Sequence, residues 1–446
     1  MIPTFLRSAL LLLGMAFAVK AAPLRILSIG DSMTEEYAYE LTFSAPDSNE
    51  FNANVRSWPE ILRIFRPTEA TLGQFEATGG SYLDLRNAGH ELNFGIPGMT
   101  LVFWKNLLYN TPSDDDDEQV LSLGYGLTRD ALEDKIGAAQ VVVILLGAND
   151  LKKEYNDLFN NTEDPNFLGD LVNNRLNLIY AWVRFLRPNV PIVVCTVPDV
   201  GATPQISGTY NVPAKQASTR AKIAAFNQSI ITWAAGKTNN PPAIARIDKL
   251  SDRLFDEQPF QLNGTVFTLP GHPENPPLRV FCKDGFHIAT MAQALVANEI
   301  MATINTKMGT NLTLFSNREI LQNLLGLNPD QPYLTWISAA GLTGSAMDAD
   351  PDRDGIPNVA EYALGTPPNS FSRPFSGSFA PGKSLSWHPD PIGLRFASLT
   401  AEESTNLATW TTVPPARTST AGDGTVSVTP AVGSKGFVRV QATARP

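Results

Sequence analysis

Short, continuously apolar segments alternate with helical patterns over roughly the first two thirds of the chain. Residues 141–146 and 191–197 are apolar at nearly every position, which is typical of parallel strands buried on both faces. Residues 171–185, 218–235 and 288–304 predict helices. The other predicted elements are strands at 24–29 and 243–247 and helices at 58–65 and 130–136. This alternation predicts an α/β domain with a parallel sheet and helices on both of its faces.

The pattern changes after about residue 308. Two short helical pieces are predicted at 320–325 and 334–339, before a segment rich in Asp and Gly. Beyond residue 365 the chain is rich in Pro, Ser and Thr, and its pattern predicts a small all-β, sandwich-like module of short strands. Its clearest alternating stretches are 394–397, 410–413 and 436–440. Its Trp387 and Trp410 either fill the core or stack on sugars.

The first residues have the pattern of a secretory signal peptide. Arg7 precedes an apolar run over 8–19, and Val19 and Ala21 supply small residues for cleavage. The alternative is a membrane anchor, but the run is shorter than the ~20 residues that a spanning helix needs, and Lys20 interrupts it. We therefore expect an exported protein without a transmembrane anchor, either extracellular, periplasmic or at the cell surface.

The length of the chain indicates several domains, and its net charge excludes some classes of partner. A chain of 446 residues exceeds one typical domain. We expect a signal peptide at 1–21, a catalytic domain at 22–308, a helical linker at 309–369 and the β module at 370–446. A net charge of −10 argues against nucleic acid and against anionic membranes. Oligomeric state is left open.

The two cysteines, Cys195 and Cys282, do not have the spacing of a metal site or a redox motif. Export permits a disulfide between them, and buried thiols are the alternative.

Four short segments carry candidate chemistry. The first, 30–34 (Gly-Asp-Ser-Met-Thr), directly follows a predicted strand, so that Ser32 lies on a strand-to-helix turn. The second, 93–100, contains glycines that allow a backbone N–H to approach an anion. The third, 147–150, ends the most apolar strand and presents the side-chain amide of Asn149.

The fourth segment is 284–287, in which a carboxylate precedes a histidine by three residues. Asp284 can accept the proton on one ring nitrogen of His287 and leave the other nitrogen as a general base. The other histidines do not have a carboxylate at this spacing and are interpreted as structural or surface residues, namely His90, His272 and His388.

Together, in this order, the four segments resemble the signature blocks of the SGNH hydrolase superfamily of GDSL-like esterases and lipases. The resemblance covers about residues 24–306 and implies a flavodoxin-like three-layer α/β/α sandwich with a five-stranded parallel sheet. It implies a triad of Ser32 as nucleophile, His287 as base and Asp284 as its orienting acid. It also implies an oxyanion hole formed by the backbone N–H groups of Ser32 and Gly98 and the side chain of Asn149, with no cofactor for catalysis.

Two departures from the family pattern concern the first block and the loops. Met33 and Thr34 stand where Leu followed by Ser or Thr is commoner, which leaves the nucleophile intact. The loops at 35–92 and 200–217 are longer than in minimal members of the family. Because such loops shape the substrate cleft, the substrate class does not follow from the resemblance.

Residues 350–361 match the pattern D-x-D-x-D-G-x₅-E of a calcium-binding loop in full. Proline at position 357 and a short incoming helix make it resemble dockerin-type or thrombospondin type-3 loops more than a regular EF-hand. We expect a structural calcium ion; a solvated acidic turn is the alternative. The predicted ligands are Asp350, Asp352, Asp354, the carbonyl of Ile356, Asn358 and Glu361.

The sequence thus predicts a secreted carboxylic ester hydrolase that works through an acyl-enzyme, and an O-acetyl group on a polysaccharide is the favoured substrate. A lipase or phospholipase acting on longer acyl chains is the nearest alternative. A calcium-dependent surface-binding protein with an inactive hydrolase domain is the alternative from another class.

Overall fold

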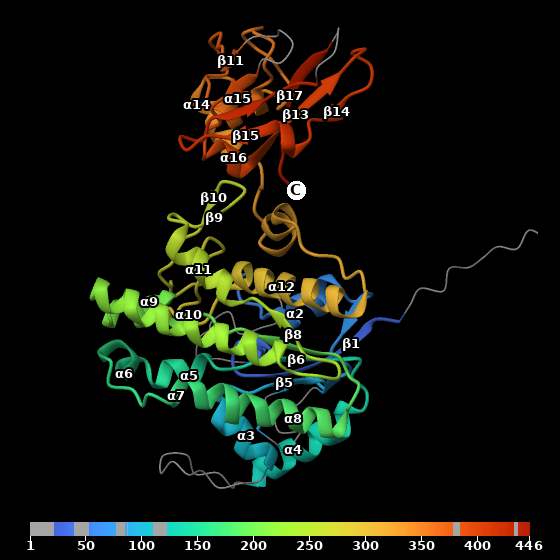
Figure 1. Cartoon of the computed structure of the whole chain (residues 1–446), viewed down its shortest axis with the longest axis vertical. Coiled ribbons are helices and arrows are strands. Elements are labelled where there is room, and N and C mark those ends of the chain that lie inside the picture. Colours follow the sequence, from blue (N-terminus) through green and yellow to red (C-terminus); the bar gives the residue numbers. More distant parts are fainter. Residues whose placement is uncertain are drawn as a thin grey trace, which may run out of the picture.

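The computed structural model of the protein describes residues 22–39, 53–76, 85–86, 88–109, 123–377, 384–431 and 436–446. The predicted signal peptide at 1–21 lies outside these described residues. The described chain forms two lobes stacked along the long axis, a large α/β lobe and a small lobe with the C-terminus (Figure 1).

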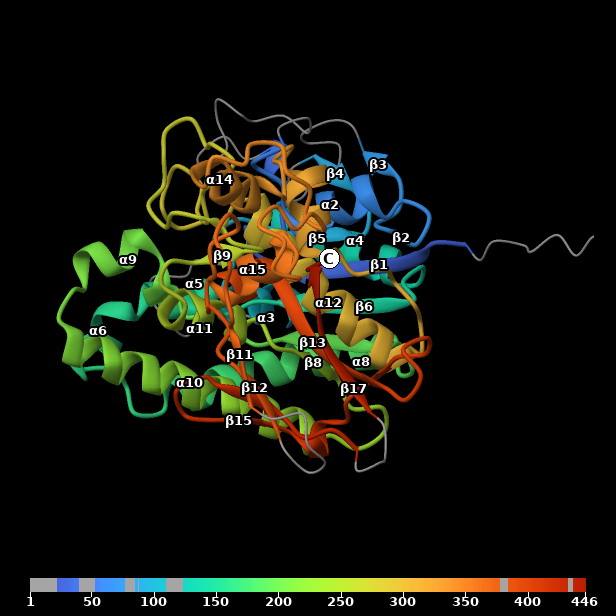
Figure 2. The ribbon, with the colours of Figure 1, turned by 90° about the horizontal axis from the view of Figure 1, so that it is seen from above.

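The large lobe is built on a sheet in which every strand pair is parallel. Its strands are β1 (Leu24–Gly30), β2 (Ala70–Thr71), β5 (Asn93–Gly95), β6 (Val141–Leu145), β7 (Ile192–Cys195) and β8 (Ala243–Ala245). The order is β2-β1-β6-β7-β8, and β5 also pairs with β1. Because β2 and β5 pair with successive parts of the same edge of β1, the six strands fill five positions. The predicted parallel α/β sheet is confirmed; β1 and β6 run side by side in Figures 1 and 2.

Alternating residues of the buried strands point to opposite faces of the sheet. In β6, Val142 and Ile144 belong to one hydrophobic core, whereas Val141, Val143 and Leu145 belong to a second core on the other face. The first core also contains residues of α3 (Leu101–Tyr109), α4 (Leu123–Ile136), α8 (Asn177–Leu186) and α10 (Pro213–Ala235). The second core contains residues of α2 (Trp58–Phe65) and α12 (Thr290–Met308). These are three layers, helices–sheet–helices, as Figure 1 shows.

Shorter elements connect these layers. The helical connections are η1 (Tyr37–Tyr39), α5 (Ala148–Lys153), α6 (Tyr155–Asn160), α7 (Phe167–Asp170), the π-helical η2 (Leu171–Leu176), η3 (Val200–Ala202), α9 (Pro204–Thr209) and α11 (Asp248–Asp256). Two small antiparallel pairs are β3 (Phe75–Glu76) with β4 (Gly89–His90) and β9 (Gln261–Leu262) with β10 (Thr265–Val266). None of the helices in the described ranges is long and apolar enough to cross a bilayer.

The segment after α12 packs back onto the large lobe. It contains α13 (Asn317–Glu319) and the π-helical η4 (Ile320–Leu324). Its apolar side chains complete the second core, namely Leu312, Phe315, Ile320, Leu321, Leu324 and Leu325. The guanidinium of Arg66 donates to both carboxylate oxygens of Glu319 at 2.8 Å and fixes this segment to the end of α2.

The small lobe combines two antiparallel sheets with helices. One sheet has the order β11-β12-β16-β15 and the other β14-β13-β17. Its strands are β11 (Phe375–Gly377), β12 (Leu385–Trp387), β13 (Ala397–Ser404), β14 (Thr411–Thr412), β15 (Thr418–Thr420), β16 (Val426–Val428) and β17 (Phe437–Ala444). Its helical elements are α14 (Gln331–Ala339), α15 (Asn358–Leu364), α16 (Gly393–Phe396) and η5 (Pro415–Arg417). The predicted short strands are therefore present, and Trp387 is buried among them.

One predicted strand is wrong. Residues 394–397 alternate polar and apolar side chains, but Leu394 to Phe396 belong to the helical turn α16, and β13 begins only at Ala397. Asp390 starts this turn, because its carboxylate accepts the backbone N–H of Gly393 at 2.9 Å. The ring of Phe396 then stacks on Tyr333 at a centroid distance of 6.1 Å. Tertiary packing outweighs the local alternation here.

Cys195 and Cys282 are both buried and are not bonded to each other. Cys195 lies in the second core of the large lobe, and Cys282 lies beside Tyr37 in a small separate cluster. The alternative of two buried thiols therefore describes the structure.

Candidate active site

The first site residue, Ser32, lies in the turn that follows β1. The backbone carbonyl of Asp31 accepts the N–H groups of Thr34 at 3.0 Å and Glu35 at 3.1 Å, which closes the turn. The carboxylate of Asp31 accepts the N–H of Met33 at 2.9 Å. Because β1 is a parallel strand, this turn lies at the carboxyl edge of the sheet, where functional groups of such sheets gather.

Asn93 of β5 supports this turn from below. Its side-chain oxygen accepts the hydroxyl of Ser28 at 2.7 Å and the N–H of Gly95 at 3.2 Å, and its amide donates to the carbonyl of Thr34 at 3.0 Å. The sequence analysis gave Asn93 no role of its own. Asn93 is the first residue of the second segment, which could have drawn attention to it. Its hydrogen-bond partners Ser28 and Thr34, however, are more than 50 residues away in sequence, so its role could not be predicted.

Asp284 and His287 lie in a tight loop just before α12. The N–H of Gly285 donates to the carbonyl of Cys282 at 2.9 Å, and the N–H of Cys282 donates to the carbonyl of His287 at 2.7 Å. Gly285 has a φ of 70°, a conformation that favours glycine. One carboxylate oxygen of Asp284 accepts the N–H groups of Phe286 and His287 at 3.0 and 3.1 Å.

The structure brings Ser32, His287 and Asp284 together in one hydrogen-bonded chain. His287 Nε2 is 2.7 Å from Ser32 Oγ, and His287 Nδ1 is 2.5 Å from Asp284 Oδ2. The edge-on rings of Phe286 and Tyr37 flank the imidazole at centroid distances of 5.3 and 6.3 Å. Both nitrogens of the ring are therefore engaged, and the ring makes edge contacts with two aromatic neighbours.

The pKa values of the two aspartates of the site are shifted in opposite directions, although burial raises both. For Asp284, burial disfavours the charged form, but the hydrogen bond and charge of His287 and the backbone amides outweigh it, and its pKa falls below the ordinary value. For Asp31, burial dominates and the nearby Asp150 adds to it, so its pKa rises to about 7. Asp284 is therefore the carboxylate that stays ionised beside the imidazole.

The other two predicted segments also lie at the carboxyl edge. Asn149 lies in the first turn of α5, shortly after β6, and its amide donates to the carbonyl of Met99 at 3.1 Å. The neighbouring Asp150 accepts the N–H of Leu101 at 2.9 Å, which ties this loop to the loop of Gly98. Gly98 has a φ of 75°, and an added Cβ there would meet nothing within 4 Å among the described residues.

Two backbone donors remain available at this edge. The N–H groups of Ser32 and Gly98 donate to no partner within the described parts of the chain. Unused backbone N–H groups at such an edge are suitable donors for an anion.

A small, largely apolar cavity of about 70 Å³ adjoins the site. Met33, which follows Ser32, contributes to its wall, as do Phe286 and Ile288 on either side of His287. The rest of the wall includes Leu254 from α11 and Leu295 from α12.

The predicted metal ligands lie in the small lobe, in the loop between α14 and α15. The three aspartates, Asp350, Asp352 and Asp354, each offer an oxygen such that these atoms lie within 4.8 Å of one another. Glu361 lies on α15 and is fully buried. Burial and the three aspartates raise the pKa of Glu361 to about 8.

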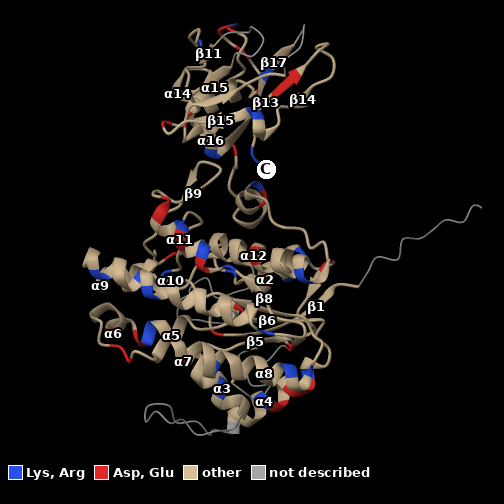
Figure 3. Ribbon diagram, viewed as in Figure 1, with Lys and Arg blue, Asp and Glu red and all other residues tan. Residues whose placement is uncertain are grey.

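Acidic and basic residues are interspersed over both lobes (Figure 3).

The other histidines have structural contacts. Nδ1 of the buried His90 lies 2.9 Å from a carboxylate oxygen of Glu36. His272 Nδ1 accepts the N–H of Glu274, and His388 lies beside Thr425.

Comparisons with known proteins place the large lobe in a family. Two similar solved structures are a family 3 carbohydrate esterase from Talaromyces cellulolyticus, with 13% identity over 64% of this chain and 99% of that one, and one from Clostridium thermocellum, with 14% identity over 65% and 100%. Both have a TM-score of 0.33. No curated protein sequence matches significantly. The model of the GDSL-like lipase/acylhydrolase family matches residues 26–300, which is more than half of the chain. The chain therefore belongs to the GDSL-like lipase/acylhydrolase family and is a hydrolase of ester bonds.

Proposed function

We propose that the protein is a serine esterase in which Ser32 is the nucleophile, His287 the general base and Asp284 the residue that orients the imidazole. The observation that carries this proposal is the chain of hydrogen bonds from Ser32 Oγ through both nitrogens of His287 to Asp284. A histidine held in this way can take the hydroxyl proton as the oxygen attacks.

The proposed reaction has two halves. Ser32 Oγ attacks the ester carbonyl while His287 Nε2 takes its proton, and the same proton then passes to the departing alcohol. This leaves an acyl group on Ser32. A water molecule attacks the acyl group as His287 takes a proton from it, and release of the carboxylic acid restores the serine hydroxyl.

The oxyanion of each tetrahedral intermediate would be held by the N–H groups of Ser32 and Gly98 and by the amide of Asn149. The unused backbone donors support the first two assignments. Asn149 has two amide hydrogens, and one bond to Met99 leaves the second for a ligand. The loss of one such donor typically lowers the rate about 10²–10³-fold.

For the natural substrate we favour an O-acetyl group on a polysaccharide. This choice rests on the sequence, namely the predicted export signal and the module that follows the catalytic domain. The protein would then act outside the cytoplasm, on a polymer too large to cross a membrane.

One observation favours a longer acyl chain as the second candidate. The apolar cavity is bordered by Met33, Phe286 and Ile288, the chain neighbours of Ser32 and His287. An acyl chain attached to Ser32 could bury its methylene groups there, at about 0.8 kcal/mol for each CH₂.

Rates on a series of p-nitrophenyl esters separate the two substrates. An acetyl optimum, together with release of acetate from an acetylated polysaccharide, supports deacetylation. An octanoyl or longer optimum supports the second candidate. In that case Ala292→Trp, which fills the cavity from α12, should lower the octanoyl rate and spare the acetyl rate. Ala302→Trp lies on the same helix but does not line the cavity, and it is the matched control.

The nucleophile itself can be labelled covalently. A fluorophosphonate should add one phosphonyl group to Ser32, located by peptide mass spectrometry. Labelling of a different serine, with Ser32 unmodified and activity lost, would overturn the assignment of the nucleophile.

A further inference from the structure

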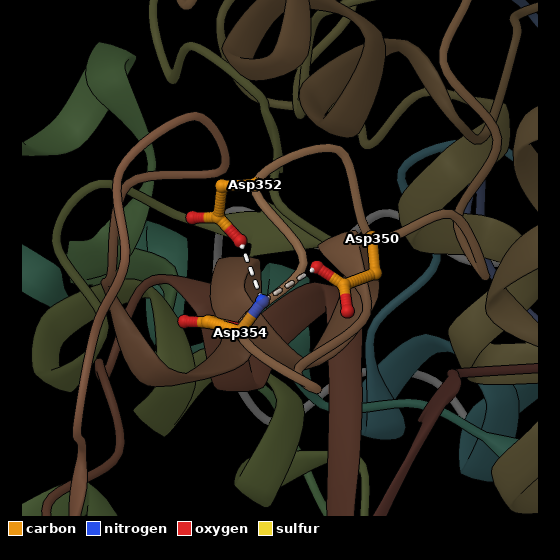
Figure 4. A group of neighbouring side chains, drawn as sticks. All are labelled: Asp350, Asp352 and Asp354. Atoms are coloured by element: carbon orange, nitrogen blue, oxygen red, sulfur yellow. Dashed lines mark hydrogen bonds between the residues drawn. The ribbon is translucent and has the colours of Figure 1, made fainter.

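Four carboxylates converge in the small lobe, outside the proposed active site. Figure 4 shows Asp350, Asp352 and Asp354 on one loop, with their carboxylates arranged around its bend. The backbone makes this bend with Arg353 at a φ of 61° and Gly355 at a φ of 92°. Like charges at this spacing repel one another, and a bound cation would remove that repulsion.

Backbone amides hold the loop in this shape. The N–H of Asp354 donates to Asp350 Oδ1 at 3.2 Å and to Asp352 Oδ1 at 3.1 Å, and the N–H of Gly355 donates to Asp350 Oδ2 at 2.9 Å. A carboxylate oxygen has two lone-pair sites. Each oxygen that accepts one N–H can therefore still bind a cation.

The buried carboxylate of Glu361 also indicates a bound cation, independently of the three aspartates. Its side chain is 0% exposed, and neither carboxylate oxygen accepts a hydrogen bond from any residue that the structure describes. The charges that act on it are those of the same three aspartates. A buried carboxylate with no donor is costly unless a cation compensates it.

Two further buried acceptors belong to the same segment. Asp352 Oδ2 and Asn358 Oδ1 accept no hydrogen bond within the described residues. The amide of Asn358 is occupied, because it donates to Ser345 Oγ at 2.9 Å and to the carbonyl of Ala346 at 2.8 Å.

We propose that Asp350, Asp352, Asp354, Glu361 and the carbonyl of Ile356 bind one calcium ion. Calcium takes six to eight oxygen ligands at 2.3–2.6 Å, and a bidentate Glu361 with water would complete that number. Magnesium demands a smaller, regular octahedron and keeps several waters, which a buried bidentate carboxylate does not suit. Asn358 Oδ1 acts through a water molecule or as a direct ligand.

The position of the site indicates that the ion stabilises the small lobe. α15 lies at the centre of the small lobe, with Val359 and Tyr362 in one core and Ala360 and Leu364 in the other. The side chain of Ile356 is buried in the same small-lobe core as Ala360 and Leu364.

The loop is also tied to the entry of the β module. Asp354 Oδ2 accepts the N–H and the hydroxyl of Ser372 at 2.8 and 2.9 Å. The ion therefore joins the loop, α15 and the sheets, and its occupancy sets the stability of the small lobe. The cores of the large lobe contain none of these residues.

Calcium binding to the full mature chain, stripped with a chelator, tests the site by titration calorimetry. We expect one Ca²⁺ per chain with a Kd of about 1 mM or tighter, and binding at least about tenfold weaker in Glu361→Gln. Asp348→Asn changes the same charge on an exposed neighbour and should bind as the wild type does. A wild-type chain that binds no Ca²⁺ at about 10 mM, or a Glu361→Gln chain that binds it normally, overturns the proposal.

Thermal unfolding distinguishes a variant that has lost the calcium site from a variant that does not fold. Calcium should raise the Tm of the small-lobe transition in the wild type, and magnesium at equal concentration should do so far less. Glu361→Gln removes the buried charge at nearly constant shape, so this variant should fold without calcium and show no calcium-dependent shift. Ester hydrolysis should be unchanged by chelator, which separates this proposal from that of the active site. A calcium-dependent shift that survives in Glu361→Gln contradicts it.

Discussion

At the residue scale, the short segment 284–287 supplies two of the three residues of the proposed triad. The spacing of Asp284 and His287 predicted their pairing, and the structure has them 2.5 Å apart. The spacing could not reveal that Asp284 first accepts the N–H groups of Phe286 and His287, because this depends on the positive φ of Gly285. Likewise, the GDS motif indicated Ser32, but the burial of Asp31 depends on packing that no local pattern encodes.

Asp284→Asn should lower kcat by about 10³–10⁴-fold while the protein remains folded. The asparagine oxygen can still accept the two backbone N–H groups, but its NH₂ would face Nδ1 and favour the wrong tautomer of His287. Initial rates and far-UV circular dichroism measure both effects. A folded variant with a rate near that of the wild type would remove Asp284 from the mechanism.

Asp31→Asn should change the pH dependence of stability. The folded-state pKa of Asp31 is about 7, above its unfolded value of 3.8. The folded protein therefore keeps a proton that the unfolded chain releases, so this group's destabilising effect grows from about pH 4 to 7 and is constant above. The Tm of the variant relative to wild type should rise over that window. Asp130→Asn, on an exposed side chain, is the matched control; a flat difference for Asp31→Asn would contradict the inference.

At the element scale, long apolar runs were predictable and short elements were not. β6 and β7 could be predicted because they are buried on both faces and are therefore apolar at every position. β5 spans only Asn93–Gly95 and has no periodicity to detect. Yet it supports the Ser32 turn so closely that a Cβ on Gly95 would lie 2.3 Å from the backbone N of Glu35. The same limit explains the error at α16, whose single turn depends on tertiary contacts.

Asn93→Ala should destabilise the large lobe by about 1–3 kcal/mol, because it leaves buried partners on β1 and on the Ser32 turn without their hydrogen bonds. It should also lower kcat more than it raises KM, since the turn would no longer be held. Asn156→Ala, at an exposed position on α6, is the matched control. Denaturant unfolding and steady-state kinetics measure the effects; equal behaviour of the two variants would argue against a supporting role.

At the scale of the whole molecule, hydrogen bonds join the described parts of the two lobes. The amide of Asn263 donates to the carbonyls of Arg445 at 3.2 Å and Pro446 at 3.3 Å. Arg395 donates to the carbonyl of Pro259. The sequence predicted a change of character near residue 308, but it could not show that the following segment closes a core of the large lobe. That closure pairs residues far apart in the chain, such as Arg66 and Glu319.

Two truncations test how far the catalytic unit extends. A chain that ends at Asn328 keeps the apolar side chains of 312–325 and should match the full chain on p-nitrophenyl acetate. A chain that ends at Met308, the predicted domain boundary, loses them at about 1.5–3 kcal/mol each. Its Tm should fall by more than about 10 °C. Equal Tm values for the two would show that the unit ends at 308.

The central claim is that Ser32 carries the chemistry, and hydrolysis of p-nitrophenyl acetate by the wild type and Ser32→Ala tests it most directly. Ser229→Ala, on the exposed side of α10, is the matched control. We predict that Ser32→Ala lowers kcat by at least about 10³-fold at unchanged Tm, and that Ser229→Ala changes nothing. A Ser32→Ala protein that hydrolyses the ester at the wild-type rate would contradict the claim.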